Sequence, residues 1–254
     1  MNESKPPVKF RAVMQESGRS GFRKYRALVY GDRGIGTVLR GELLGMVAGG
    51  VRGGFGLWLR SRLYPAMFAR TGNGVFFGRN VTLRHAHKIV LGHNVVIDDN
   101  AVLDAKGETN TGIVLGDNVY IGRNTIVYCK NGNIRIGNNV NVSSNCELFS
   151  SNDLVVEQDT VIGAYSYLLS GGEYDLQDRE RPFSQQSGMN TKGPLSIGAN
   201  CWIGARVTVL DAASVGEHCV IGAGAVVTRP VPPGSVAAGV PARVLRSLDA
   251  AAST

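Results

Sequence analysis

The chain has 254 residues, of which 43% are hydrophobic and 19% are charged. These fractions exclude an intrinsically disordered chain and allow a sizeable buried core. The formal net charge is +7, but residues 1–70 contain 13 of the 27 Lys and Arg and only 4 of the 20 Asp and Glu. The positive charge is therefore concentrated at one end, which argues against a nucleic-acid groove along the whole protein.

Residues 1–74 form an N-terminal basic and apolar segment that we expect to be helical. Its apolar stretch lies between Glu42 and Arg52, contains several glycines, and is too short and too polar to span a bilayer. Basic residues beside Trp58 and Phe22 suit an interfacial helix on an anionic membrane. Helices that pack on the end of the following domain fit the same residues. Both interpretations stay open, so peripheral membrane contact is one of two expectations.

After this segment, an aliphatic residue recurs at every sixth position and is usually followed by Gly. Leu115, Ile121 and Val127 form one set, and Ile197 and Val215 begin two sets that lie 18 residues apart. The period is not 3.6 and glycine would weaken a helix, so a helical interpretation fails. Three hexads instead predict a triangular coil, with Gly and Asn at its corners and one inward aliphatic side chain on each side. Such coils must stack to bury that face, which predicts an all-β parallel solenoid.

The array is expected over residues 75–246, with two excursions. A spacing of 24 between two repeats indicates that Ala105–Gly112 bulges outward. A spacing of 41 leaves about 23 residues outside the coil, which places a long loop at about 170–192; loops of this length are usually functional. Residues 247–254 are expected to be a flexible tail.

The four cysteines contain no CxxC pair and are expected to be small, reduced packing residues. No secretory signal pattern opens the chain, so a cytoplasmic protein is expected, with contact at the inner face of the membrane as the variant. The cysteines are Cys129, Cys146, Cys201 and Cys219.

Three segments carry a family resemblance: Ile197–Gly204 (IGANCWIG), Ile221–Thr228 (IGAGAVVT) and Ala238–Arg243 (AGVPAR). Together with the repeats, they resemble the hexapeptide-repeat acyltransferases, near the galactoside/maltose acetyltransferase-like and polysaccharide O-acetyltransferase branch. The resemblance implies a left-handed parallel β-helix, a homotrimer with active sites between adjacent prisms, and acetyl-CoA as co-substrate.

The resemblance also implies roles for individual residues. Small side chains suit the long, amide-rich pantetheine arm of coenzyme A, and arginines suit its phosphates. Asn145 matches a position that binds the acceptor sugar, and we expect Tyr174 to contact the acceptor as well. The positions that match the coenzyme A channel are Trp202, Ala205, Ala223, Thr228, Arg243 and Arg246.

The family generally places a histidine at the start of the long loop, where it acts as the general base because its pKa lies near working pH. Residues 169–175 contain no histidine. Either Glu173 or Asp175 replaces it, which would require desolvation of the carboxylate. Alternatively, His218 arrives from a neighbouring subunit, or catalysis is lost. All three alternatives stay open.

A metal site is not expected. His85 and His87 form a His-x-His pair of the kind used in zinc sites of related folds, but such a site needs three well-placed imidazoles. His93 and His218 occupy outward positions of hexads, where a solvated histidine is the simpler interpretation.

The resemblance therefore implies an acetyl-CoA-dependent O-acetyltransferase. Its expected acceptor is a hydroxyl of a saccharide or lipid-linked saccharide, in polysaccharide or glycan biosynthesis, and no nucleic-acid partner is expected. Two alternatives remain: a non-catalytic β-helix scaffold or binding protein, and an N-acetyltransferase acting on an amino sugar, whose amine needs less help from a base.

Overall fold

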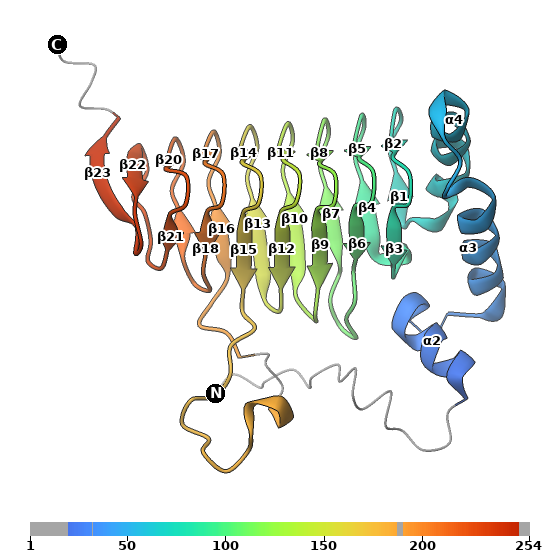
Figure 1. Cartoon of the computed structure of the whole chain (residues 1–254), viewed down its shortest axis with the longest axis horizontal. Helices are drawn as coiled ribbons and strands as arrows, with labels where there is room; N and C mark the ends of the chain where they lie inside the picture. The colour runs from blue at the N-terminus through green and yellow to red at the C-terminus, as the bar shows by residue number, and fades with distance from the viewer. Residues whose placement is uncertain (1–19, 32, 187–189, 249–254) are drawn as a thin grey trace.

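The structure is a computed structural model that describes residues 20–31, 33–186 and 190–248. Residues 1–19 of the N-terminal segment and 249–254 of the expected tail lie outside the described residues. Helices occupy one end of the molecule, and a single stack of short strands extends from them to the other end (Figure 1). The stack is a parallel β-helix, which confirms the fold predicted from the period of six.

The first sheet forms one side of the β-helix, and its register confirms the spacing of the repeats. Leu91 lies beside Leu115, and Ile197 lies beside Val215. Its strands, in order, are β1 (Arg70–Thr71), β4 (Ile89–Leu91), β7 (Ile113–Leu115), β10 (Asn133–Ile136), β13 (Asp153–Val156), β16 (Leu195–Ile197) and β19 (Ser214–Val215).

The second sheet carries the end of the array. Its last strand runs antiparallel to its neighbour, so Arg243–Ser247 forms a terminal hairpin strand and not a further coil. Its strands are β2 (Phe76–Phe77), β5 (Val96–Ile97), β8 (Tyr120–Ile121), β11 (Asn141–Val142), β14 (Val161–Ile162), β17 (Trp202–Ile203), β20 (Val220–Ile221), β22 (Ser235–Ala238) and β23 (Arg243–Ser247).

The third sheet completes each coil, and both predicted excursions leave from its strands. Ala105–Gly112 follows β6, and the long loop follows β15 and contains the 3-10 turn η3 (Phe183–Gln185). The strands are β3 (Thr82–Arg84), β6 (Val102–Asp104), β9 (Ile126–Cys129), β12 (Glu147–Ser150), β15 (Tyr167–Ser170), β18 (Thr208–Val209) and β21 (Val226–Val227).

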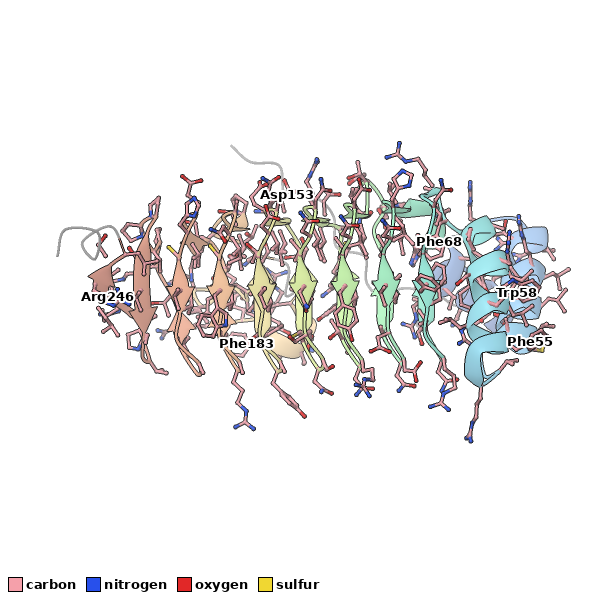
Figure 2. All side chains as sticks on the ribbon, turned by 90° about the horizontal axis from the view of Figure 1, so that it is seen from above. Phe55, Trp58, Phe68, Asp153, Phe183 and Arg246 are labelled. Carbon is pink, nitrogen blue, oxygen red and sulfur yellow. The ribbon has the colours of Figure 1, made fainter. Side chains whose placement is uncertain are left out.

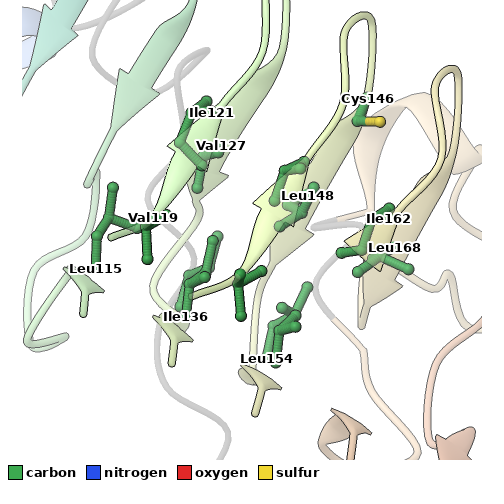
Figure 3. Close-up of a cluster of buried hydrophobic side chains, with 14 of the residues drawn as sticks. Leu115, Val119, Ile121, Val127, Ile136, Cys146, Leu148, Leu154, Ile162 and Leu168 are labelled. Atoms are coloured by element: carbon green, nitrogen blue, oxygen red, sulfur yellow. The ribbon is translucent and has the colours of Figure 1, made fainter. Parts of the chain in front are cut away.

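Two side chains per hexad fill the interior, one more than the sequence pattern predicted (Figure 3). They are the aliphatic residue of the period, such as Ile121, and the residue two positions before it, such as Val119. Ile121, Leu148 and Leu168 are fully buried. Burying such a side chain contributes about 2 kcal/mol, so the stacked hexads supply the main stabilising term. All four cysteines are buried and free, as expected for packing residues.

The corners of the coils contain residues with positive φ, which asparagine tolerates better than other side chains. At the first corner, between the first and second sheets, Asn118 donates to Asn139 over 2.9 Å, and Asn139 donates to Asp159 over 2.8 Å. At the second corner, between the second and third sheets, Asn124 donates to Asn145 over 3.1 Å. These amide ladders connect successive coils. The third corner, between the third and first sheets, carries the two excursions.

The N-terminal segment is helical where it is described. It forms α2 (Gly21–Tyr30), α3 (Ile35–Ala48) and α4 (Gly53–Leu63), which together we call the helical cap, followed by the 3-10 turn η1 (Tyr64–Met67). Ser20 caps α2, because its Oγ accepts a hydrogen bond from the N–H of Arg23 over 3.4 Å. A second 3-10 turn, η2 (Ala86–Lys88), adjoins the first coil. No helix within the described ranges is long and apolar enough to cross a bilayer.

Candidate functional site

The second sheet presents one of the residues expected to bind coenzyme A. Trp202 begins β17, and its indole is 63% exposed, whereas Ile203 beside it is buried. On the flanking strands Val161 and Val220 occupy the same register. The alternation of strand side chains thus directs Trp202 outward, where it can pack against a ligand.

Small side chains line the second corner next to Trp202. Ala205 and Ala223 occupy equivalent positions on successive coils, both are exposed, and Gly224 N–H donates to the Ala205 carbonyl over 2.9 Å. A Cβ at Gly204 would lie only 2.6 Å from the nitrogen of Ala223, so this close stacking requires glycine. Ala205, Ala223 and the main chain beside them form an exposed strip, which we call the small-residue strip. A pantetheine arm can lie along it.

Two arginines follow on the terminal hairpin. Arg243 and Arg246 lie on β23, both are exposed, and neither has a carboxylate partner among the described residues. Arg243 donates only to the carbonyl of Ala242, over 3.0 Å. Figure 2 shows Arg246 at the end of the molecule opposite to the helices. The two guanidinium groups are available to pair with phosphate.

Thr228 lies apart from these groups. It follows β21 of the third sheet, so it begins the third corner, whereas Ala205 and Ala223 occupy the second. Within one chain, therefore, the structure brings together five of the six predicted coenzyme A residues on the second sheet and its adjoining corner, and it places Thr228 on a different edge.

Asn145 occupies the second corner, two coils before Arg206. Its φ is 60°, and its side-chain oxygen accepts from Asn124. At the same corner Tyr165 and Arg206 follow, with the guanidinium of Arg206 5.8 Å from the Tyr165 ring centre. Asn145 therefore belongs to the corner ladder, and it shares an edge with the small-residue strip.

The long loop leaves the third corner through two glycines with positive φ. Gly171 and Gly172 have φ of 87° and 89°, which other residues rarely adopt. A Cβ at Gly172 would lie 2.9 Å from the ring of Phe149, which is buried beneath the loop. The loop therefore starts close to the coil and reaches outward from there (Figure 1).

Glu173 closes the base of this loop. It forms an antiparallel bridge with Asn190, with hydrogen bonds of 2.9 and 3.1 Å, and its Oε1 accepts from Lys192 Nζ over 2.5 Å. The ion pair raises the pKa of Lys192. The Glu173 side chain is 35% exposed, so the chain alone does not provide the desolvation that a carboxylate base requires.

Asp175 and Tyr174 have different surroundings. Asp175 Oδ1 accepts from the N–H groups of Gln177, over 2.9 Å, and Asp178, over 3.3 Å, so this carboxylate organises the loop backbone. Tyr174 is 46% exposed and packs edge-on against Phe183, with ring centres 5.7 Å apart. In each of the two carboxylates one oxygen is engaged: Asp175 Oδ1 by the loop backbone and Glu173 Oε1 by the side chain of Lys192.

Asp211 was not identified from the sequence, yet it fixes the returning end of the loop. It is 7% exposed and accepts from Lys192 N–H over 2.5 Å and from Thr191 Oγ1 over 3.1 Å. Its only sequence signal is a polar residue in an aliphatic stretch. Asp211 thus holds the main chain of Lys192, and Glu173 holds its side chain.

The histidines do not supply a base at the loop within one chain. His218 is exposed at the first corner, where Nδ1 lies 2.8 Å from the amide nitrogen of Asn200. His85 is buried and lies 3.2 Å from Asp104. No group of three or more His, Cys, Asp or Glu suited to hold a metal ion occurs in the described part of the chain.

A cavity of about 720 Å³ lies between the helical cap and the first coil, lined by residues that include Tyr30, Glu42, Met67 and His87. None of the predicted site residues lines it. The predicted groups instead lie on two open edges of the β-helix. The long loop leaves the third corner, and the small-residue strip and Asn145 lie on the second corner.

Comparison with known proteins supports the repeat and the fold. Residues 194–229 match the family model described as bacterial transferase hexapeptide (six repeats). The Staphylococcus aureus (strain Mu50) protein SAV2555, named as a candidate acetyltransferase, is 35% identical over 117 residues, which cover 46% of this chain and 56% of that protein. The galactoside O-acetyltransferase of Escherichia coli K12 is 31% identical over 135 residues, which cover 53% of this chain and 64% of that protein. The chain thus spans little more than half the length of the relatives it matches.

Among solved structures, a mutant of AntD, an N-acyltransferase from Bacillus cereus in complex with dTDP-4-amino-4,6-dideoxyglucose and coenzyme A, has a TM-score of 0.51. The similarity covers 74% of this chain and 88% of that chain, at 18% sequence identity. At this identity the likeness establishes the β-helical fold alone.

Proposed function

We infer that this chain, a hexapeptide-repeat protein of the acyltransferase type, transfers an acetyl group from acetyl-CoA to a saccharide. The observation that carries the proposal is the continuity of Trp202, Ala205, Ala223 and the two arginines of β23 along one edge. Each part of coenzyme A finds complementary chemistry there: the phosphates at the arginines and the pantetheine arm along the alanines.

The acceptor side of the site is proposed to form between copies of the chain in a homotrimer. The loop with Glu173 and Tyr174 leaves the third corner, whereas Asn145 and the small-residue strip lie on the second corner. Thr228 lies on the third corner, as the loop does. Packing the third corner of one prism against the second corner of the next places these groups in one cleft. Such packing would also remove water from Glu173, which its proposed role requires.

Glu173 is our proposed general base. Its Oε1 is held by Lys192, and its second carboxylate oxygen faces no described partner, so it can accept the proton of an acceptor hydroxyl. The hydroxyl oxygen then attacks the thioester carbonyl carbon, the carbon–sulfur bond breaks, and the thiolate of coenzyme A leaves. Asp175 is the weaker candidate because its Oδ1 already binds two loop amides.

The proposal is tested by release of free coenzyme A from acetyl-CoA in the presence of mono- and oligosaccharide acceptors. Wild type should release it only with acceptor, and Glu173→Gln should lower kcat by about 100-fold or more while acetyl-CoA affinity is kept. Asp175→Asn is the matched control. An equal loss in both variants would argue that the loop matters only for its shape.

Two other outcomes identify the alternative functions. Release with amino sugars but not with their hydroxyl analogues would establish N-acetylation, for which a weakly basic amine needs less help from a base. Binding of acetyl-CoA without release for any saccharide, in both wild type and Glu173→Gln, would favour a binding protein that lacks the catalytic step.

A further inference from the structure

The helical cap contains a helix that is apolar on both faces. Val38 and Ala48 of α3 are buried, and Leu44 packs against the core. The opposite side of α3 is apolar as well, and a helix that is apolar all round is normally covered on every side. In the described structure this outer side has no protein partner.

The outer side lies on α3, the outermost helix of the molecule (Figure 1). Its exposed apolar residues form a stripe along one side of this helix. Leu39 is 64% exposed and Met46 is 75% exposed, at spacings that keep them on one face with Ile35, Leu43 and Val47. Exposed patches of this kind mark an interaction site rather than a random surface feature.

Two aromatic residues of α4 are exposed at the same end of the molecule. Phe55 and Trp58 are stacked with ring centres 5.9 Å apart, and both are more than half exposed. Figure 2 shows both at the end of the molecule remote from Arg246. We call the exposed side chains of α3 and α4 the cap face. Its members are Ile35, Leu39, Leu43, Met46, Val47, Phe55 and Trp58.

The charges around the cap face are almost all positive. Arg33, Arg40, Arg52 and Arg62 are exposed. Residues 20–63 contain eight Lys and Arg against two acidic residues, Asp32 and Glu42. Glu42 is also engaged, because it accepts hydrogen bonds from the hydroxyls of Tyr25 and Tyr30. An apolar stripe with exposed arginines complements a surface that is apolar inside and anionic outside.

We propose that the cap face binds the surface of an anionic phospholipid bilayer, with α3 lying in the interface. The stripe and the aromatic pair would enter the boundary between headgroups and acyl chains, and the arginines would pair with lipid phosphates. A second copy of the chain is a poorer partner, because a symmetric contact through this face would bring arginines against arginines.

The dimensions fit a helix that lies on the bilayer. The 14 residues of α3 extend over about 21 Å, which is too short to cross the hydrocarbon region. Strands in adjacent coils are spaced by about 4.8 Å, so the long loop on the fifth coil stands about 20 Å along the prism from the first coil. Bilayer binding through the cap face does not depend on the proposed chemistry.

The test is co-sedimentation of the full chain with vesicles of phosphatidylcholine alone and of phosphatidylcholine with roughly a third phosphatidylglycerol. We expect binding to the anionic vesicles and weaker binding at high salt. Leu39→Glu should reduce the partition coefficient by about tenfold or more, because it places a charge in the apolar layer. Leu245→Glu is the matched control, because Leu245 on β23 is 66% exposed at the other end.

Substitutions of the exposed arginines test the electrostatic contribution to vesicle binding independently. Replacing Arg52 and Arg62 by Gln should weaken binding to anionic vesicles by about fivefold per charge, whereas Arg135→Gln on β10 should have no such effect. Circular dichroism melting checks that each variant is folded. Absence of wild-type binding to the anionic vesicles would overturn the proposal. An equally large reduction in the control variants would also overturn it. If the wild type does not bind vesicles and Leu39→Glu changes the oligomeric mass, the cap face is instead a contact between two copies of the chain.

Discussion

The guanidinium of Arg60 donates from Nε to the carbonyl oxygen of Phe77 over 2.8 Å, which joins α4 to the first coil. The same side chain, only 3% exposed, donates from Nη1 to the carbonyls of Ala48, over 3.0 Å, and Val51, over 2.7 Å. One buried cation therefore satisfies main-chain acceptors at the end of α3, in the following turn and in β2. It connects the helical cap to the β-helix.

Replacing Arg60 by Met should destabilise the protein by about 3 kcal/mol, because three carbonyl oxygens lose a charged donor. The free energy of unfolding in urea measures the effect. Arg62→Met, at an exposed position two residues away, should change it by no more than about 0.5 kcal/mol. A similar loss for both would contradict the role assigned to Arg60.

His87 predicts a pH dependence of stability. Burial, with Arg33 nearby, lowers the pKa of His87 to about 4, against about 6.5 in the unfolded chain. The folded state therefore keeps His87 neutral where the unfolded state binds a proton. Its contribution to stability is complete above about pH 6.5 and decreases as the pH falls toward about 4. The ring is partly exposed, so a loss of about 1 kcal/mol is expected after discounting for solvent.

Urea unfolding at several pH values checks this expectation. His87→Gln should flatten the decrease between about pH 6.5 and about pH 4, whereas His93→Gln, on an exposed turn, should leave it in place. A slope unchanged in His87→Gln would show that other groups titrate over this range.

Substitutions at Asn139, in the ladder at the first corner, can separate the cost of lost hydrogen bonds from the cost of backbone strain. Asn139 has φ of 59° and both donates and accepts in the ladder. Asn139→Ala should cost about 2 kcal/mol, because it loses the amide hydrogen bonds and places a Cβ in the left-handed region. Asn139→Gly loses the hydrogen bonds alone, so it should recover about half of that cost. Equal costs for Ala and Gly, measured from urea midpoints, would show that backbone strain is absent.

The small-residue strip predicts a steric block. Ala205→Phe places a large side chain on an exposed corner, so stability should change little while acetyl-CoA affinity falls by about tenfold or more. Ala69→Phe, at an exposed position near the first coil, is the control. Unchanged affinity in Ala205→Phe, measured by calorimetry, would remove the strip from the proposed site.

The sequence predicted the β-helix well because its signal is periodic. An aliphatic residue recurs at every sixth position, and each recurrence supports the prediction that the equivalent positions, such as Ile121 and Leu168, point inward. Asn and Gly at the corners add a second periodic signal. The long loop was also predictable, since it interrupts the period.

The remaining features have no period. Arg60 is buried because it donates hydrogen bonds to carbonyls of β2 and of the turn after α3. Asp211 is buried because it accepts hydrogen bonds from the returning end of the loop. Neither contact leaves a pattern in the sequence. The antiparallel strand β23 was not predicted either, because a single strand that runs against its neighbour repeats nothing. The candidate site was only partly accessible, since its groups lie on two corners of one chain.

Calorimetric titration of acetyl-CoA into the full chain tests the central claim most directly, with wild type compared to the double variant Arg243→Gln, Arg246→Gln. The account predicts saturable binding to wild type and an affinity lower by about tenfold or more in the double variant, because each lost charge-assisted contact is worth more than about 1 kcal/mol. Absence of binding to wild type, or equal affinity in both proteins, would contradict it.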